Sequence, residues 1–295
     1  MDHHTGGPDE QGHLRTHPRT AVTMSRVAQG VASFAFAAAG TAGFVTTVVT
    51  FVVASIICTV GALLVGEGHR ILPTLRMGRV WAVAVVGFIS MVLAATAYEL
   101  ASVAVVSFLL LLVPLFSGLL APLYGERMTR NGVIGLGISV LGIIAFAQPS
   151  QDYQAEPLGL VAALLGGLGL AILWMMSRGL ATMNDGLWAL SATQMIGPAL
   201  LGLLVITVSG SLPAGVGMWW LIVAGIGYAG NTIWRLMGLR LLPASTAALL
   251  SPISALVSTA MGIVILNEIP DALTWFGATV ITLGVIIATR PSPGR

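Results

Sequence analysis

Two stretches decide the fold of this chain: LYGERMTRNGVIGLGISVLGIIAF at residues 123–146 and LNEIPDALTWFGATVITLGVIIA at residues 266–288. In both, a glutamate (Glu126 or Glu268) is followed by one glycine nine residues later and by another sixteen residues later. The two copies are 142 residues apart, close to half of the 295-residue chain. Each glutamate joins two apolar runs. The pattern predicts a repeated unit of helix, acidic turn and helix, which in a membrane protein is typical of transporters.

The composition places most of the chain in a bilayer. Hydrophobic residues make up 56% of the sequence, charged residues make up 8%, and the mean hydropathy is +0.94. A soluble domain has about 25% charged residues. All 13 basic residues are arginines that stand singly or in small groups between apolar runs. The pI of about 9.1 therefore does not indicate a surface that binds nucleic acid.

Runs of about 20 apolar residues are long enough to cross a bilayer as helices. They predict an all-α integral membrane protein with ten transmembrane helices, at residues 25–42, 44–65, 80–98, 101–123, 131–148, 157–177, 187–208, 217–237, 244–266 and 272–289. The first run is the weakest, because it contains Arg26 and Gln29. Residues 1–23 are polar and predict a disordered tail. Its four histidines lack a regular metal-binding spacing, and we expect neither a metal nor a cofactor.

The arginines indicate how the ten helices are oriented. Cytoplasmic loops carry an excess of arginine and lysine, and with ten spans one side receives both termini and every arginine, Arg26 and Arg235 included. We therefore predict that the N- and C-termini are cytoplasmic. Five spans separate the turns at Glu126 and Glu268. Because five is odd, the two five-helix halves are predicted to insert in opposite orientations, as an inverted repeat.

Each half also has a proline inside an apolar run, Pro114 in the fourth predicted helix and Pro252 in the ninth. Proline removes a backbone hydrogen bond and kinks a helix. One interpretation is that the two kinks border a central cavity; the other is that they are ordinary membrane-helix prolines. Glu126 and Glu268 are predicted to be structural, as acceptors for the N-terminal amides of the next helix.

The doubled register resembles the EamA-like family of the drug/metabolite transporter superfamily over residues 24–290. The matching residues are Pro114, Gly125-Glu126-Arg127-Met128-Thr129, Gly135, Gly142, Leu242-Pro243-Ala244-Ser245, Glu268, Gly277 and Gly284. The second turn departs from the family pattern, as Asn267-Glu268. The resemblance implies two EamA-like repeats, at 24–148 and 157–290. It also implies a multi-pass carrier of the cell (inner) membrane without a cofactor, often an exporter of amino acids or related metabolites.

Polar side chains inside membrane helices are costly, so they are the first candidates for a functional site. Tyr228, Asn231 and Arg235 lie on one face of the eighth predicted helix, where the guanidinium would bind a carboxylate. The alternative is that Arg235 extends to the membrane interface. Gln194 and Trp174, on neighbouring helices, are further cavity candidates. Their alternatives are a helix–helix hydrogen bond for Gln194 and an interface anchor for Trp174.

Tyr98 and Glu99 end the third predicted helix on the outer side. Glu99 would carry a proton or act as a gate; the alternative is a solvated turn. Enzyme motifs are missing from the sequence: it has no nucleotide-binding glycine loop and no Ser/His/Asp set, since the only histidine outside the tail is His69.

We therefore predict a secondary transporter that moves small metabolites across the cytoplasmic membrane by alternating access, as an exporter. Its expected partners are a small-molecule substrate and the lipid bilayer, not nucleic acid, and a homodimer is left open. The alternatives are a non-transporting membrane sensor or scaffold and a membrane-embedded enzyme. The sequence does not specify the substrate, the direction of transport or the coupling ion.

Overall fold

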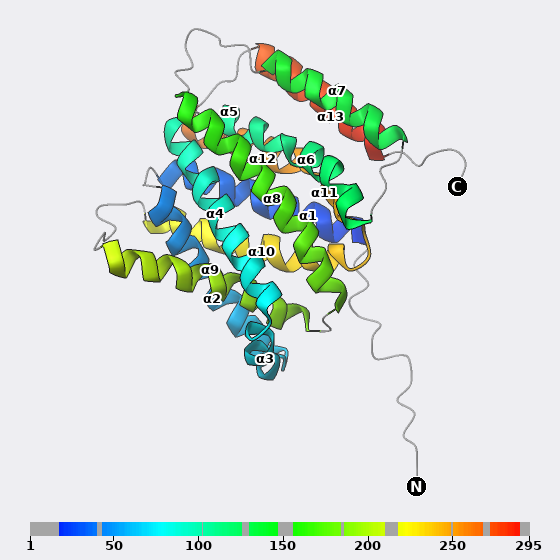
Figure 1. Cartoon of the computed structure of the whole chain (residues 1–295). Coiled ribbons are helices and arrows are strands. Elements are labelled where there is room, and N and C mark those ends of the chain that lie inside the picture. Colours follow the sequence, from blue (N-terminus) through cyan, green and yellow to red (C-terminus); the bar gives the residue numbers. More distant parts are fainter. Residues whose placement is uncertain are drawn as a thin grey trace.

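Apolar runs bounded by proline, glycine and asparagine set the helices of the chain. The computed structural model shows these helices as one bundle, with no strand in the part that it describes (Figure 1). The described residues are 18–39, 43–101, 103–125, 130–146, 156–183, 186–209, 218–248, 250–267 and 272–289. Residues 1–17 of the predicted tail and the predicted turn residues Glu126 and Glu268 lie outside these ranges.

The first half of the chain forms seven α-helices and three short 3₁₀ segments in its described residues. They are α1 (Pro18–Ala39), α2 (Gly43–Leu64), η1 (Gly68–Arg70), α3 (Ile71–Leu75), α4 (Gly78–Leu100), α5 (Val103–Leu109), η2 (Leu110–Leu112), α6 (Val113–Leu120), η3 (Ala121–Tyr124) and α7 (Arg130–Phe146). The second half forms α8 (Pro157–Met183), α9 (Leu187–Ser209), α10 (Met218–Leu239), α11 (Ala244–Ala248), α12 (Pro252–Leu266) and α13 (Ala272–Thr289).

Proline is the first residue of α1, α8 and α12. Its missing N–H costs nothing in a first turn, and its fixed φ suits the helix. Helix α1 therefore begins at Pro18, inside the segment 1–23 that the sequence predicts as a disordered tail. Ala21 and Val22 are buried in the bundle, which explains why the helix extends this far.

Two of the predicted continuous helices are interrupted in the structure. The run 101–123 is divided into α5, η2, α6 and η3, and Pro114 is the second residue of α6. The run 244–266 is divided into α11 and α12, and Pro252 is the first residue of α12. Each proline lacks the N–H that would continue the hydrogen-bond ladder of the preceding turn. The chain consequently starts a new helix at or next to each proline.

The two acidic turns begin with the same backbone conformation. Gly125, which follows η3, has a φ of 72°, and Asn267, which follows α12, has a φ of 56°. Both values lie in the left-handed region that ends many helices, where asparagine is the usual substitute for glycine. Asn267 therefore takes the same left-handed conformation as the glycine at the matching position of the first half.

Six helical segments of the described chain are long and apolar enough to cross a membrane. They are Phe44–Leu64, Gly78–Leu100, Val105–Tyr124, Pro157–Met183, Leu187–Val208 and Thr246–Leu266. Helices α1 and α10 are not among them, and both carry buried polar residues, among them Arg26 and Arg235. The structure thus supports a multi-pass membrane protein by length and composition, and the count of ten spans stays a prediction.

The helices of the two halves pack against each other in matching pairs. Helix α1 packs on α10, and α4 packs on α8; α2 packs on α9, and α7 packs on α13. In the repeat, α1 corresponds to α8, α2 to α9, α4 to α10 and α7 to α13. Under this correspondence the pair α1–α10 becomes α8–α4, and the pairs α2–α9 and α7–α13 each become themselves. The packing therefore has the two-fold pattern expected of a repeat.

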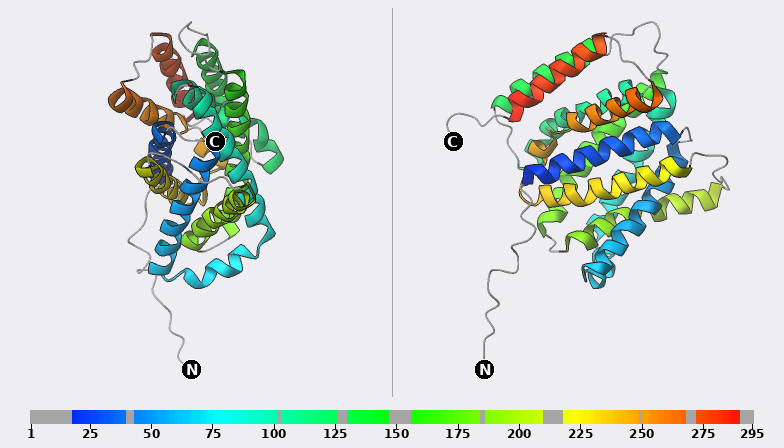
Figure 2. Two further views of the ribbon diagram at one scale, coloured as in Figure 1. Left: turned by 90° about the vertical axis from the view of Figure 1, so that its left-hand side faces the viewer. Right: turned by 180° about the vertical axis from the view of Figure 1, so that it is seen from behind.

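Helices α7 and α13 lie side by side at one edge of the bundle in both views (Figures 1 and 2). The four glycines of the doubled register, Gly135, Gly142, Gly277 and Gly284, are all buried. A Cβ atom added at Gly284 would lie 2.8 Å from the backbone nitrogen of Ser139. The two helices therefore approach more closely than a larger residue allows, which is how small residues stabilise helix pairs in lipid.

Candidate polar cavity between the two halves

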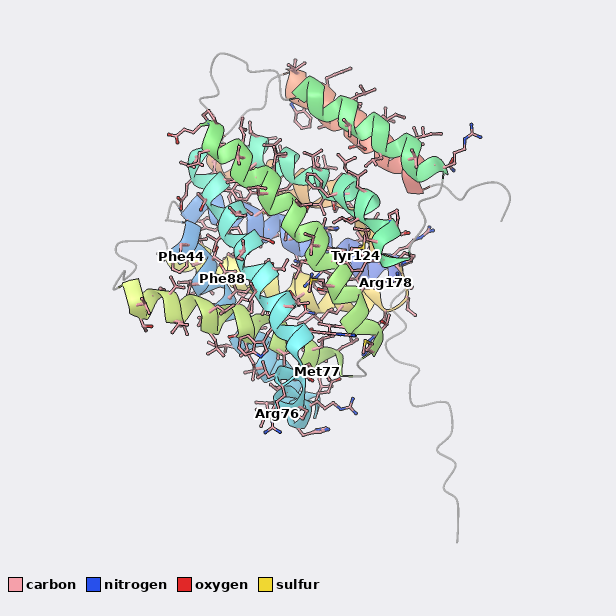
Figure 3. The ribbon with its side chains drawn as sticks, in the orientation of Figure 1. Phe44, Arg76, Met77, Phe88, Tyr124 and Arg178 are labelled. Atoms are coloured by element: carbon pink, nitrogen blue, oxygen red, sulfur yellow. The ribbon has the colours of Figure 1, made fainter. Side chains whose placement is uncertain are left out.

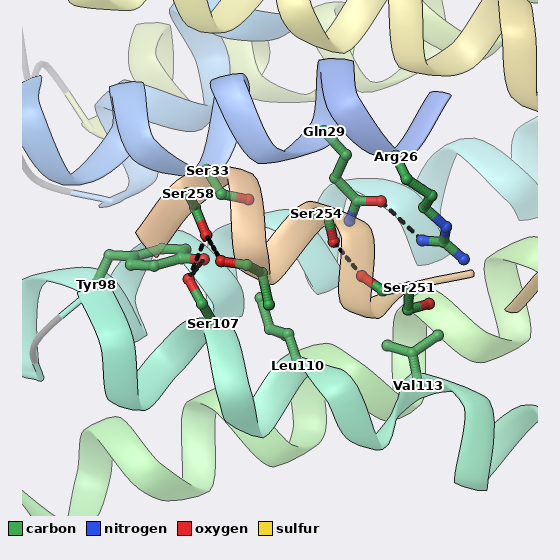
Figure 4. Close-up of a pocket in the computed structure, with 11 residues that line it drawn as sticks. Arg26, Gln29, Ser33, Tyr98, Ser107, Leu110, Val113, Ser251, Ser254 and Ser258 are labelled. Atoms are coloured by element: carbon green, nitrogen blue, oxygen red, sulfur yellow. Dashed lines mark hydrogen bonds between the residues drawn. The ribbon is translucent and has the colours of Figure 1, made fainter. Parts of the chain in front are cut away.

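A small polar cavity lies where α1 faces α4, α5 and α12 (Figure 4). Its lining residues are Arg26, Gln29, Ser33, Tyr98, Ser107, Leu110, Val113, Ser251, Ser254, Ala255 and Ser258. The space open to the centre of a water-sized sphere is about 10 Å³, which is room for about one water molecule. The cavity is therefore too small for a metabolite in this conformation.

Two polar stripes face each other across the cavity. Arg26, Gln29 and Ser33 are spaced three and four residues apart on α1, which places them on one face of the helix. Three serines with the same spacing stand at the start of α12: Ser251, Ser254 and Ser258. The first precedes Pro252, so the interruption between α11 and α12 borders the cavity.

Hydroxyl groups join three helices at the far end of the cavity (Figure 4). The Tyr98 hydroxyl of α4 lies 3.2 Å from Ser107 Oγ of α5. Ser107 Oγ in turn lies 3.0 Å from Ser258 Oγ of α12. Nearer to Arg26, Ser254 Oγ donates to the carbonyl of Ser251 at 2.7 Å. The cavity thus offers hydroxyls that can donate or accept a hydrogen bond.

Arg26 is the charged group of the cavity, and its side chain is 1% exposed. Its Nη1 donates to Gln29 Oε1 at 2.8 Å, and its Nη2 lies 3.4 Å from the carbonyl oxygen of Ala247. The guanidinium carbon lies 3.8 Å from the centroid of the Trp174 ring, within cation–π range. Nε is buried and has no hydrogen-bond partner in the described chain.

Arg235 of α10 lies against the same indole ring, with its guanidinium carbon 5.7 Å from the Trp174 centroid. The side chain is 2% exposed. Nη2 donates to Gln194 Oε1 at 3.1 Å, and Nη1 donates to Ser177 Oγ at 3.4 Å. Trp174 is itself 2% exposed. One buried tryptophan therefore supports two buried cations, one from each half of the chain.

The oxygen atoms that accept from the two guanidiniums are all neutral: two amides, a carbonyl and a hydroxyl. The carboxylates of the described chain lie elsewhere. Glu67 Oε2 accepts from the backbone N–H of Ala189 at 2.9 Å, while Glu99 and Glu156 are exposed. Buried cations are costly without an opposite charge. The site therefore carries a positive charge that no described carboxylate balances.

Residues 24–147 and 157–290 match the EamA-like transporter family, one copy in each half. The chain belongs to this family. The resemblance predicted from the doubled register is thereby confirmed, and the protein is a multi-pass membrane protein of a family of transporters. It is also similar to a protein of known crystal structure, with a TM-score of 0.70 and 21% identity over 92% of this chain and 96% of the other. No curated protein sequence matches it.

In this EamA-like chain, the predicted candidates on α8, α9 and α10 come together. Arg235 contacts both Gln194 and Trp174 in the buried cluster described above. Asn231 accepts a hydrogen bond of 2.6 Å from Ser25 Oγ of α1. Tyr228 is buried, with its ring edge-on to Phe51 at 5.3 Å between centroids. The alternatives place Arg235 and Trp174 at the membrane interface, which would require both side chains to be exposed. Both are buried instead.

The remaining candidates divide between the cavity and the surface of the EamA-like bundle. Tyr98 lines the cavity, whereas Glu99 is exposed at the end of α4 and is not among the lining residues. Pro114 and Pro252 are buried, and the residues before them, Val113 and Ser251, line the cavity. Both interrupted helices therefore border the site.

Sequence reasoning missed the residues of α1. It counted Arg26 with the arginines of the cytoplasmic side and took Arg26 and Gln29 as signs of a weak first helix. In the structure Arg26 is buried and lines the polar cavity, a role that the sequence analysis did not give it. The signal was present as polar residues at three- and four-residue spacing, at Arg26, Gln29 and Ser33 and again in the serines of α12.

Proposed function

We propose that this protein is a secondary transporter that moves small metabolites across the cytoplasmic membrane by alternating access. One observation carries the proposal: a polar cavity lies between the two halves, and both interrupted helices line it. The first half contributes α1, α4, α5, η2 and α6, and the second half contributes α12 with the residue that precedes it.

Interrupted helices are informative in a membrane protein. Their freed backbone groups cannot face lipid, so such breaks are tolerated where they are buried in protein or line a cavity. In transporters built from repeats, the substrate site lies at the repeat interface between discontinuous helices. The breaks at Pro114 and Pro252 meet this condition, which supports a site of transport over a passive scaffold.

The small size of the cavity supports a carrier that changes conformation. A metabolite needs more room than the single water that fits here. Separation of α1 from α12 would open the site. Exchange of the two halves relates this pair to α8 with α5 and α6, so a second, related separation is available. Opening on one side and then on the other is alternating access.

The orientation belongs to the proposal as well. We expect ten spans, two inverted five-helix halves and cytoplasmic termini in the cell membrane. The described arginines outside the two buried ones support this arrangement, because they stand in or near the short connections. Figure 3 shows Arg76 beside α3 and Arg178 in α8, both away from Phe44 at the start of α2. Export rather than import rests on the family resemblance.

A counterflow assay tests the proposed function. Purified protein would be reconstituted into proteoliposomes that are loaded with one unlabelled compound, and entry of its radiolabelled form would be followed. The panel would hold amino acids, hydroxy acids, amides, sugars and inorganic phosphate. We expect saturable entry of at least one compound, above protein-free liposomes. Folded protein that moves none of them would reject transport and favour the sensor or scaffold.

A further inference from the structure

The chemistry of the cavity identifies a substrate class. We propose that the transporter binds a small organic anion, with a carboxylate on the guanidinium of Arg26 and its polar substituents against the serines of α12. This inference rests on the proposed transport function. It differs from the amino acids that the family resemblance implies, because it requires a net negative charge.

Two unpartnered polar atoms in the cavity lining provide the first step. Arg26 Nε and Ser251 Oγ are both buried, and neither has a hydrogen-bond partner among the described residues. The two residues line the same cavity. Buried polar atoms are nearly always hydrogen-bonded in proteins, so these two atoms are available to bind a ligand that enters the cavity. Both atoms carry a hydrogen that can be donated to an oxygen.

Charge provides the second step. Arg26 and Arg235 lie over one ring and interact unfavourably as like charges. Their hydrogen-bond acceptors are neutral, and the Trp174 ring compensates only part of the cost of burying a cation. One carboxylate would offset one of the two charges. A guanidinium is also the side chain best suited to bind a carboxylate, because its donors match the two oxygens.

The absence of an acidic lining residue provides the third step. All lining residues are described, and besides Arg26 they are neutral. The ammonium group of an amino acid would find hydroxyls there but no carboxylate, and it would add a third positive charge near Arg26 and Arg235. Hydroxyl groups of a ligand, by contrast, can pair with Ser254 and its neighbours as donor or acceptor. A hydroxy acid fits this lining better than a zwitterion.

The experiment compares ligands of similar shape and different charge in the counterflow assay. The probes are glycerate (an anion), glyceramide (its neutral amide), serine (a zwitterion) and inorganic phosphate. We expect saturable counterflow of glycerate, and no competition from glyceramide at equal concentration. Glyceramide that competes as well as glycerate would overturn the inference, because the carboxylate would then contribute nothing.

Substitutions test whether Arg26 is the group that binds the carboxylate. Arg26→Gln should lower the kcat/KM for glycerate about 100-fold, since it removes a buried charged partner. Ser254→Ala should lower it about fivefold, as expected for one neutral hydrogen bond. Arg76→Gln is the matched control, because Arg76 is exposed and distant from the cavity, and it should leave transport unchanged. If Arg26→Gln does not fold, Ser254→Ala and the ligand series still decide the question.

The outcomes separate the two proposals. Counterflow of serine without glycerate would overturn the anion inference and keep the transporter. Counterflow of phosphate alone would keep the negative charge but reject the carboxylate. Equal loss of transport in Arg26→Gln and Arg76→Gln would reject the place of Arg26 in the site. No counterflow of any compound would reject the proposed function itself.

Discussion

The pair of helices α7 and α13 at the edge of the bundle, the edge pair, differs from the cavity around α1 and α12 in one respect. Its contact residues occur in both halves of the sequence, and those of the cavity do not. The edge pair is the part of the molecule that the sequence repeats, with buried glycines at matching positions in both helices. The cavity is formed by residues that the sequence does not repeat. Helix α1 carries Arg26 at the site, whereas its counterpart α8 carries no charged residue before Arg178.

This difference separates packing from chemistry. A close contact between two helices that play the same role in two halves requires small residues on both helices, and the glycines accordingly occur in both halves. A ligand that binds between the halves needs only one set of partners. The bundle is therefore two-fold in its helix contacts and asymmetric in its charge. In such a chain the residues that occur in both halves indicate where helices pack, and the polar residues that occur in only one half indicate the binding site.

The largest effect is expected for Trp174→Ala, in the cluster that Trp174 forms with Arg26 and Arg235. The ring is fully buried and supports both guanidiniums, so its removal leaves a cavity and two poorly compensated cations. We expect a loss of about 4 kcal/mol in the free energy of unfolding. Thermal or denaturant unfolding in detergent would measure it. Trp219→Ala is the control, because Trp219 is 67% exposed, and a loss of equal size there would contradict a special role for Trp174.

The edge pair is broken by Gly284→Leu. The added side chain would collide with the backbone of α7 near Ser139, and we expect a loss of about 2 kcal/mol from overpacking. The KM for the substrate should not change, since neither helix lines the cavity. Gly137→Leu on α7 controls for helix propensity, because a Cβ atom there meets nothing within 4 Å. A raised KM in Gly284→Leu but not in Gly137→Leu would show that the packing of α7 on α13 affects the cavity.

The smallest expected effect concerns the two arginines within the central region. Arg235 contacts Trp174 but does not line the cavity. Arg235→Gln should therefore lower the kcat/KM for an anionic substrate only about tenfold, or about 1.4 kcal/mol, less than Arg26→Gln. Counterflow would measure it, with exposed Arg130→Gln as the control. A larger loss in Arg235→Gln than in Arg26→Gln would make Arg235 the primary contact, as the sequence pattern alone predicts.

Much of the fold was predictable because its signals are local. The apolar runs mark the positions of the long helices, and the prolines mark where two of them are interrupted. The repeated glycines indicate that the two halves share one unit, and the contact between α7 and α13 is seen only in the structure. The sequence prediction differs at α1, which begins at Pro18 inside the predicted tail, and at the runs around Pro114 and Pro252, which are divided rather than kinked.

The site was predictable only in part. Arg235, Gln194 and Trp174 stand out as polar or large residues within apolar runs, and the structure brings them together. Arg26 also stands out, but its charge was assigned to a helix end. The polar residues of α1 share one face of the helix, but the sequence does not show whether that face points into the bundle or towards the cytoplasmic side. Only the packing of α1 against α10 and α12 shows that Arg26 faces the centre.

The separation of the edge pair from the cavity also bears on how such a chain can evolve. A change in α7 has to suit α13, so this pair tolerates few single substitutions. A change at a cavity-lining residue of α1 or α12 leaves that pair untouched, because neither α7 nor α13 lines the cavity. Single substitutions on the lining faces can therefore change the chemistry of the cavity while the contact of α7 with α13 stays intact.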